Sequence, residues 1–241
     1  MSCVFITGAT SGIGLQLTKD YAQAGWQVIA CGRNKDKLKE LQDTHHTVTG
    51  LAFDVTDLDA AKAALKDLTP EPQLWILNAG DCEYIDDGVI DAALVKRVFD
   101  INVIGLVNTI EACQPRFSLG HRVAIVGSIA SEMALPRAEA YGASKAAVSY
   151  LARTLQVDLR PKGVEVSVIY PGFVATPLTD KNTFPMPMMV SVEEASQAIR
   201  LGLSKGRPHI YFPAKFTSIL RLIGLLPYRW QNTIAAKLMT S

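Results

Sequence analysis

The stretch Val4-Phe-Ile-Thr-Gly-Ala-Thr-Ser-Gly-Ile-Gly14 places Gly8, Gly12 and Gly14 directly after a short apolar run. Without Cβ atoms, such residues let a strand turn sharply into a helix and let the backbone approach a diphosphate at the positive helix N-terminus. The spacing is G-x-x-x-G-x-G, and it allows the same strand-to-helix turn as the more familiar G-x-G-x-x-G. Glycine-rich turns also occur in unrelated doubly wound proteins. The stretch predicts a parallel α/β sheet whose first turn binds a dinucleotide.

Short β-branched and apolar runs alternate with segments of helical periodicity along the chain. This alternation predicts a doubly wound parallel sheet of about seven strands with helices on both faces, a three-layer Rossmann-type α/β fold. The length of 241 residues suits a single domain, residues 1–241, with residues 214–241 as a C-terminal extension. We expect strands at residues 4–7, 27–31, 49–53, 74–77, 123–126, 164–169 and 209–212, and helices at 15–24, 35–44, 58–68, 92–117, 141–160 and 192–203.

The composition indicates a globular protein, since 49% of the residues are hydrophobic and 20% charged, with a mean hydropathy of +0.17. We expect neither a signal peptide nor a membrane span, because the sequence has no basic region leading into a long apolar stretch. A cytoplasmic location is expected, with no nucleic-acid partner. The cysteines lack the spacing of a disulfide framework or a zinc site, and they are Cys3, Cys31, Cys82 and Cys113.

The sequence Gly32-Arg33-Asn34 follows the second expected strand, where a carboxylate would bind the ribose 2′-hydroxyl of NAD. No acidic residue stands here to repel a 2′-phosphate, and the Arg33 guanidinium can pair with one, with Ser11 or Lys35 as further partners. An alternative is that Arg33 is a solvated loop charge. The stretch favours NADP(H) over NAD(H).

Tyr141 and Lys145 stand about one helical turn apart in Tyr-Gly-Ala-Ser-Lys, and Ser128 follows an apolar, strand-like run. A nearby ammonium favours phenolate and would lower the pKa of Tyr141 from its ordinary value of about 10. Ser128 would then hold the oxygen that gains or loses the proton. A tyrosine and a lysine at this spacing also occur by chance on amphipathic helices. Together with the glycine turn, the pair favours a proton-transfer site.

These motifs resemble the short-chain dehydrogenase/reductase family over about residues 3–212. The resemblance implies that Tyr141 is the general acid in carbonyl reduction, and the base in alcohol oxidation, while Ser128 binds the substrate oxygen. Lys145 would bind the nicotinamide ribose and lower the pKa of Tyr141, and Asn102 would support a proton relay through water. The implied catalytic set contains no metal, and it consists of Asn102, Ser128, Tyr141 and Lys145.

The resemblance also assigns a cofactor site along the carboxyl ends of the strands. Asp54 and Val55 would contact the adenine, and residues 78–80 would line the cofactor floor. The segment around Pro171 and Thr176 would hold the nicotinamide end. The implied cofactor-binding residues are Gly8, Thr10, Ser11, Gly12, Ile13, Gly14, Arg33, Asn34, Asp54, Val55, Asn78, Ala79, Gly80, Tyr141, Lys145, Pro171, Gly172, Val174 and Thr176.

The expected activity is NADPH-dependent reduction of a small-molecule carbonyl substrate, an aldehyde, a ketone or a 3-oxoacyl compound. The alternatives are NADP-dependent alcohol oxidation at the same residues and a dinucleotide-sensing protein without turnover. The resemblance implies a homodimer or homotetramer. Residues 177–191 contain phenylalanine, proline and methionine, which suggests a cap over a hydrophobic substrate, although the same residues could anchor a surface loop.

The C-terminal residues combine apolar stripes with basic charge. Residues 195–241 contain seven Lys and Arg and no Asp or Glu. The stripes could pack on the subunit's own core, on a second subunit or on an anionic membrane surface, and we favour the first two over peripheral membrane contact. Two amphipathic helices separated by Pro227 are expected, with stripes formed by Phe216, Ile219, Leu220 and Ile223 and by Trp230, Ile234 and Leu238.

Overall fold

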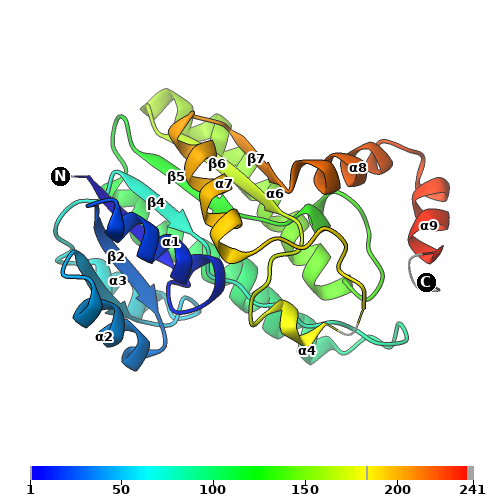
Figure 1. Cartoon of the computed structure of the whole chain (residues 1–241), viewed down its shortest axis with the longest axis horizontal. Coiled ribbons are helices and arrows are strands. Elements are labelled where there is room, and N and C mark those ends of the chain that lie inside the picture. The colour runs from blue at the N-terminus through cyan, green and yellow to red at the C-terminus, as the bar shows by residue number, and fades with distance from the viewer. Residues whose placement is uncertain (1, 183, 238–241) are drawn as a thin grey trace.

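The computed structural model describes residues 2–182 and 184–237 (Figure 1). Seven parallel strands form one sheet in the order β3-β2-β1-β4-β5-β6-β7. The predicted doubly wound, Rossmann-type parallel sheet is therefore confirmed. The strands are β1 Cys3–Thr7, β2 Gln27–Gly32, β3 Val48–Ala52, β4 Leu74–Leu77, β5 Arg122–Val126, β6 Glu165–Pro171 and β7 His209–Phe212.

Helices cover both faces of the sheet and bury two apolar cores. In β1, Cys3 and Phe5 belong to the core under α3, α5 and α6, whereas Val4 and Ile6 belong to the core under α1, α2 and α7. This alternation follows from the two-residue period of a strand. The helices are α1 Gly12–Gln23, α2 Lys35–Thr44, α3 Leu58–Leu65, α4 Ala92–Phe99, α5 Gly105–Cys113, α6 Glu139–Leu159, α7 Val192–Ser204, α8 Ala214–Gly224 and α9 Tyr228–Lys237.

Residues 92–116 are helical, as predicted for 92–117, but they do not form one regular α-helix. A π-helical turn, Asp100–Ile104, separates α4 from α5, and a 3₁₀ turn, Gln114–Arg116, follows α5. Apolar periodicity alone did not reveal the extra residue of a π turn. The turn carries the buried Asn102, whose hydrogen bonds are described below.

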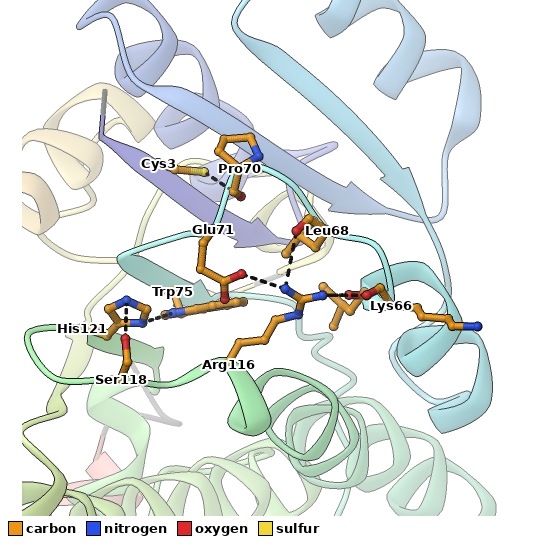
Figure 2. A network of polar contacts seen from close by, with 10 residues as sticks. Cys3, Lys66, Leu68, Pro70, Glu71, Trp75, Arg116, Ser118 and His121 are labelled. Atoms are coloured by element: carbon orange, nitrogen blue, oxygen red, sulfur yellow. Dashed lines mark hydrogen bonds and ion pairs between the residues drawn. The ribbon is translucent and has the colours of Figure 1, made fainter.

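Other helix ends differ from the prediction by a few residues. Helix α1 begins at Gly12 and α6 at Glu139, whereas α3 ends at Leu65 rather than at residue 68. The Arg116 guanidinium donates to the carbonyl oxygens of Leu65 at 2.6 Å and Lys66 at 2.7 Å. Figure 2 shows Arg116 beside Lys66 at this helix end. The arginine thereby satisfies carbonyls that a helix end leaves unpaired.

The C-terminal tail forms helices α8 and α9 on either side of Pro227. Leu238, which we placed in the second apolar stripe, lies outside the described residues. Over the described ranges, no helix combines the length and the apolar character needed to cross a membrane. In Figure 1 the two helices project from the β7 side, with α9 at the extreme end of the molecule.

Candidate active site

The glycine turn joins β1 to α1 at the carboxyl edge of the sheet. Gly8 and Gly12 have φ angles of +66° and +50°, a region that side chains with a Cβ rarely adopt. A Cβ atom at Gly14 would lie 2.2 Å from the Gly8 carbonyl oxygen, so the turn closes only around glycine. The motif therefore has the backbone shape that its spacing predicted.

The turn is fixed by the segments that follow β4 and β6. The Asn78 side chain donates to the Thr7 carbonyl oxygen at 3.1 Å, and the backbone N–H of Asn78 donates to the Thr7 hydroxyl at 3.0 Å. A Cβ at Gly12 would lie 3.1 Å from Cγ2 of Thr176. Parts of three predicted cofactor motifs thus meet around one turn. Asn78 holds the turn in shape.

A groove runs from this turn across the ends of β2, β3 and β4. Eight predicted cofactor residues line it, and four further residues, Cys31, Gly32, Phe53 and Ile101, were not in the prediction. Cys31, Gly32 and Phe53 lie at the carboxyl ends of expected strands, a position that could have identified them. The predicted residues in the groove are Gly8, Thr10, Ser11, Arg33, Asp54, Val55, Ala79 and Gly80.

Arg33 and Asp54 face each other across the groove wall. The Arg33 Nη1 atom lies 3.6 Å from Oδ2 of Asp54, and the Arg33 side chain remains 71% exposed. Burial opposes ionisation of Asp54, but hydrogen bonds from Thr56, together with Arg33, outweigh it and lower the pKa of the carboxyl group. A Cβ at Gly32 would lie 2.7 Å from Cγ2 of Thr10, so Thr10 restricts an acidic side chain there.

Some predicted cofactor residues have structural contacts that the prediction did not include. The Asn34 side chain accepts from the backbone N–H of Lys37 at 2.9 Å and caps α2. The side chains of Ile13 and Val174 pack in the core under α1 and α7. Gly172 follows β6, where its N–H donates to the Phe212 carbonyl oxygen at 2.7 Å.

Ser128, Tyr141 and Lys145 meet beyond the other end of the groove. Ser128 follows β5 and forms a hydrogen bond with Tyr141, which lies in the first turn of α6. The Lys145 ammonium lies 5.8 Å from the centre of the Tyr141 ring and donates to the Val126 carbonyl oxygen at 3.1 Å. Lys145 and Ser128 are buried. The spacing therefore correctly placed Tyr141 and Lys145 on one face of a helix.

Asn102 ties this cluster to the loop after β4. Its side-chain oxygen accepts from the Asp81 N–H at 2.7 Å, and its amide donates to the Asp81 carbonyl oxygen at 2.8 Å and to the Ser144 hydroxyl at 2.9 Å. A Cβ at Gly80 would lie 3.0 Å from Oδ1 of Asn102 and 3.3 Å from Nζ of Lys145. The groove and the Ser128, Tyr141 and Lys145 cluster therefore share one wall at Gly80.

The pKa of Tyr141 is raised in this structure, not lowered as predicted. Burial raises the pKa of Tyr141 above its ordinary value, the Cys82 thiol raises it further, and the hydrogen bond with Ser128 lowers it in part. Burial also lowers the pKa of Lys145 to about 8. Desolvation therefore sets the direction of both pKa shifts. Tyr141 is a neutral phenol at neutral pH, as it also would be at its ordinary pKa of about 10, and it can donate a proton.

Two side chains that the sequence did not identify as site residues, Cys82 and Tyr84, lie beside Tyr141. Burial raises the pKa of Tyr84, and the nearby Cys82 and Tyr141 raise it further, while a hydrogen bond from Asn182 lowers it. The Tyr84 ring packs at 5.3 Å, centre to centre, against Phe184 of the predicted capping segment. The capping segment therefore does lie over the loop next to Tyr141, with aromatic contacts.

The described part of the chain holds no group of three or more His, Cys, Asp and Glu side chains placed to bind a metal ion. The glycine turn lies at a helix N-terminus, the groove lies at the carboxyl ends of parallel strands, and Ser128, Tyr141 and Lys145 cluster at its end. Together these features define a dinucleotide-dependent oxidoreductase. The short chain dehydrogenase family model matches residues 2–185. The chain belongs to this family.

Relatives in this family include both named reductases and solved cofactor complexes. A sulfoacetaldehyde reductase from Chromohalobacter salexigens is 36% identical over 187 residues, which cover 73% of this chain and 74% of the relative. A short chain dehydrogenase from Burkholderia cenocepacia, solved in complex with NADP, is 25% identical with a TM-score of 0.85, covering 100% of this chain and 98% of that one. A short chain dehydrogenase/reductase from Burkholderia phymatum, solved with NAD, shares the fold at 22% identity and a TM-score of 0.82, covering 92% of each chain.

Proposed function

We propose that this oxidoreductase reduces a carbonyl compound with NADPH and that Tyr141 donates the proton. The observation that carries the proposal is the meeting of Ser128 and Tyr141 with Lys145 beside Gly80, where the groove ends. A proton donor at the end of a dinucleotide groove can act on the group that receives the hydride. The predicted catalytic roles fit this arrangement.

The chain's own residues would divide the chemistry as follows. When bound, the reduced nicotinamide supplies the hydride that reaches the carbonyl carbon. Tyr141, a neutral phenol at neutral pH, gives its phenolic proton to the carbonyl oxygen, which Ser128 orients by a hydrogen bond. The product is an alcohol. The Lys145 ammonium stabilises the phenolate that remains, and Asn102 holds the loop that carries Asp81.

The preference for NADPH is supported by the end of β2. Gly32 brings no carboxylate to the wall of the groove, and Arg33 offers a guanidinium that can pair with a 2′-phosphate. The NADP complex of the Burkholderia cenocepacia relative agrees with this preference, and the NAD complex of the other structure shows that the fold also accepts NAD. Arg33 is therefore the residue on which the preference depends.

The test is consumption of NADPH, compared with NADH, in the presence of a panel of aldehydes, ketones, quinones and 3-oxoacyl thioesters. We expect turnover of at least one carbonyl class with NADPH and weaker turnover with NADH. Turnover with NADH exceeding that with NADPH by tenfold would remove the cofactor proposal. Tight NADPH binding without turnover of any compound in the panel would instead favour a dinucleotide-sensing protein.

A further inference from the structure

One face of the C-terminal helices packs on the protein's own body. Leu220 of α8 and Ala235 of α9 are buried against Ile129 and Met133, which follow β5 near Ser128. Gln231 fixes the turn between the helices by donating to the carbonyl oxygens of Gly224 at 2.9 Å and Leu226 at 2.8 Å. Packing on the subunit's own core therefore accounts for this face.

The other face leaves large apolar side chains in solvent. Leu225 and Tyr228 are each 82% exposed and Leu222 is 65% exposed, all within seven residues of sequence around Pro227. Single exposed apolar residues are ordinary, but a contiguous group marks an interaction surface. We call the following set the tail patch: Ile219, Leu222, Leu225, Leu226, Tyr228 and Trp230.

The helices that carry the tail patch have only basic charged side chains of their own. Residues 214–237 contain Lys215, Arg221, Arg229 and Lys237 and no Asp or Glu, whereas Glu132 of the body lies beside α8 at Gly224. The guanidinium of Arg221 lies 4.2 Å from the centre of the Tyr211 ring, and that of Arg229 lies 5.5 Å from the Trp230 ring. The first contact holds Arg221 against β7 of the body, and the second holds Arg229 beside Trp230 of the tail patch. The surface therefore combines exposed leucines, a tyrosine and a tryptophan with fixed positive charge.

We propose that the tail patch docks on the surface of an anionic phospholipid bilayer. Its leucines would enter the boundary between headgroups and acyl chains, Tyr228 and Trp230 would lie at headgroup level, and Arg229 would face lipid phosphates. A second copy of this chain is a poorer occupant, because a two-fold contact through the tail patch would bring the same basic segments together. An anionic surface complements that charge.

Docking would also bring the candidate active site close to the bilayer. Phe216 of α8 packs at 5.4 Å, centre to centre, against Phe173, which lies 6.1 Å from Phe184 of the capping segment. An apolar carbonyl compound dissolved in the bilayer would thus approach Tyr141 along this row of phenylalanine rings. This extension rests on the proposed function, whereas the docking itself does not.

The test is flotation of the full chain with vesicles of phosphatidylcholine, alone or mixed with phosphatidylserine. We expect binding to the mixed vesicles that weakens with added salt, and about a tenfold or greater loss of binding in Leu225→Glu. Leu119→Glu is the matched control, since Leu119 is also 82% exposed but lies outside the tail patch, before β5. The control variant should bind vesicles like the unaltered protein.

Three results would overturn the docking proposal. They are absence of binding to mixed vesicles, equal binding to both vesicle types at low salt, and equal loss of binding in both variants. Sedimentation equilibrium without vesicles serves as the companion measurement. If Leu225→Glu dissociates an oligomer while the unaltered protein ignores vesicles, the tail patch is a subunit interface. Vesicle binding needs neither cofactor nor substrate, so its failure is distinguishable from a failure of the proposed reductase activity.

Discussion

Arg33→Ala is the perturbation that isolates the proposed preference for NADPH. The guanidinium stands at the wall of the groove, is 71% exposed, and lies 3.6 Å from Asp54. The substitution would remove the cation proposed to pair with the 2′-phosphate and would leave the Asp54 carboxylate without this partner. Both effects disfavour a bound phosphate, and neither acts on a ribose hydroxyl. Binding of NADPH should weaken while binding of NADH does not.

The size of the effect follows from the exposure of Arg33. Hydrogen bonds to charged groups contribute about 1.5–3 kcal/mol, whereas exposed ion pairs contribute about 0.2–1 kcal/mol. Because the side chain is 71% exposed, we take an intermediate value of about 1–2 kcal/mol. That free energy corresponds to a loss of about 5- to 30-fold in affinity for NADPH. Added salt should reduce the difference between the variant and the unaltered protein.

Calorimetric titration with NADPH and with NADH measures both affinities. Lys37→Ala is the matched control: it removes one positive charge from the first turn of α2, but Lys37 pairs with Glu40 at 2.7 Å and does not line the groove. The reasoning is refuted if Arg33→Ala leaves NADPH affinity within about twofold of the original. Equal weakening of NADH binding would also refute it, because the loss would then not depend on the 2′-phosphate.

Further predictions concern the turn, the hydroxyl and the ammonium. Gly14→Ala should abolish dinucleotide binding in calorimetry and lower the urea concentration at the midpoint of unfolding, because its Cβ would lie 2.2 Å from the Gly8 carbonyl oxygen. A Cβ at Gly142 would make only ordinary contacts, so Gly142→Ala should not lower that midpoint. Ser128→Ala should reduce kcat about 10²-fold without changing the Kd for NADPH, and a KM effect alone would contradict its role. The pKa of Lys145 is lowered to about 8, so its ammonium is present at neutral pH and is lost above pH 8. The value of kcat/KM for reduction should therefore fall as the pH rises through about 8. A flat pH profile in this range would contradict the role of the ammonium.

The sequence predicted the features that depend on local backbone shape. The glycine turn, the order of strand and helix, and the Tyr141 and Lys145 pair on one helix face all follow from spacing, because a turn and a helix each have a fixed geometry. The amphipathic periodicity of the tail likewise anticipated a break at Pro227, which separates α8 from α9.

Features that depend on packing between distant segments could not be predicted this way. Tyr84 reaches Tyr141 from a loop after β4, and its neighbours Asn182 and Phe184 come from the segment after β6. The direction of the shift in the Tyr141 pKa is likewise set by burial. The spacing between Tyr141 and Lys145 in the sequence does not predict how deeply the phenol is buried. The π-helical turn at Asp100–Ile104 was missed because the apolar pattern continues through it.

The central claim is that Tyr141 donates the proton during carbonyl reduction, and Tyr141→Phe tests it most directly. The measurement is NADPH consumption with a carbonyl compound that the unaltered protein reduces, together with the Kd for NADPH of both proteins. We predict that kcat falls by at least about 10²-fold while the Kd for NADPH stays unchanged, because only the phenolic hydroxyl is lost. Undiminished turnover in Tyr141→Phe would contradict the assignment of Tyr141 as the acid.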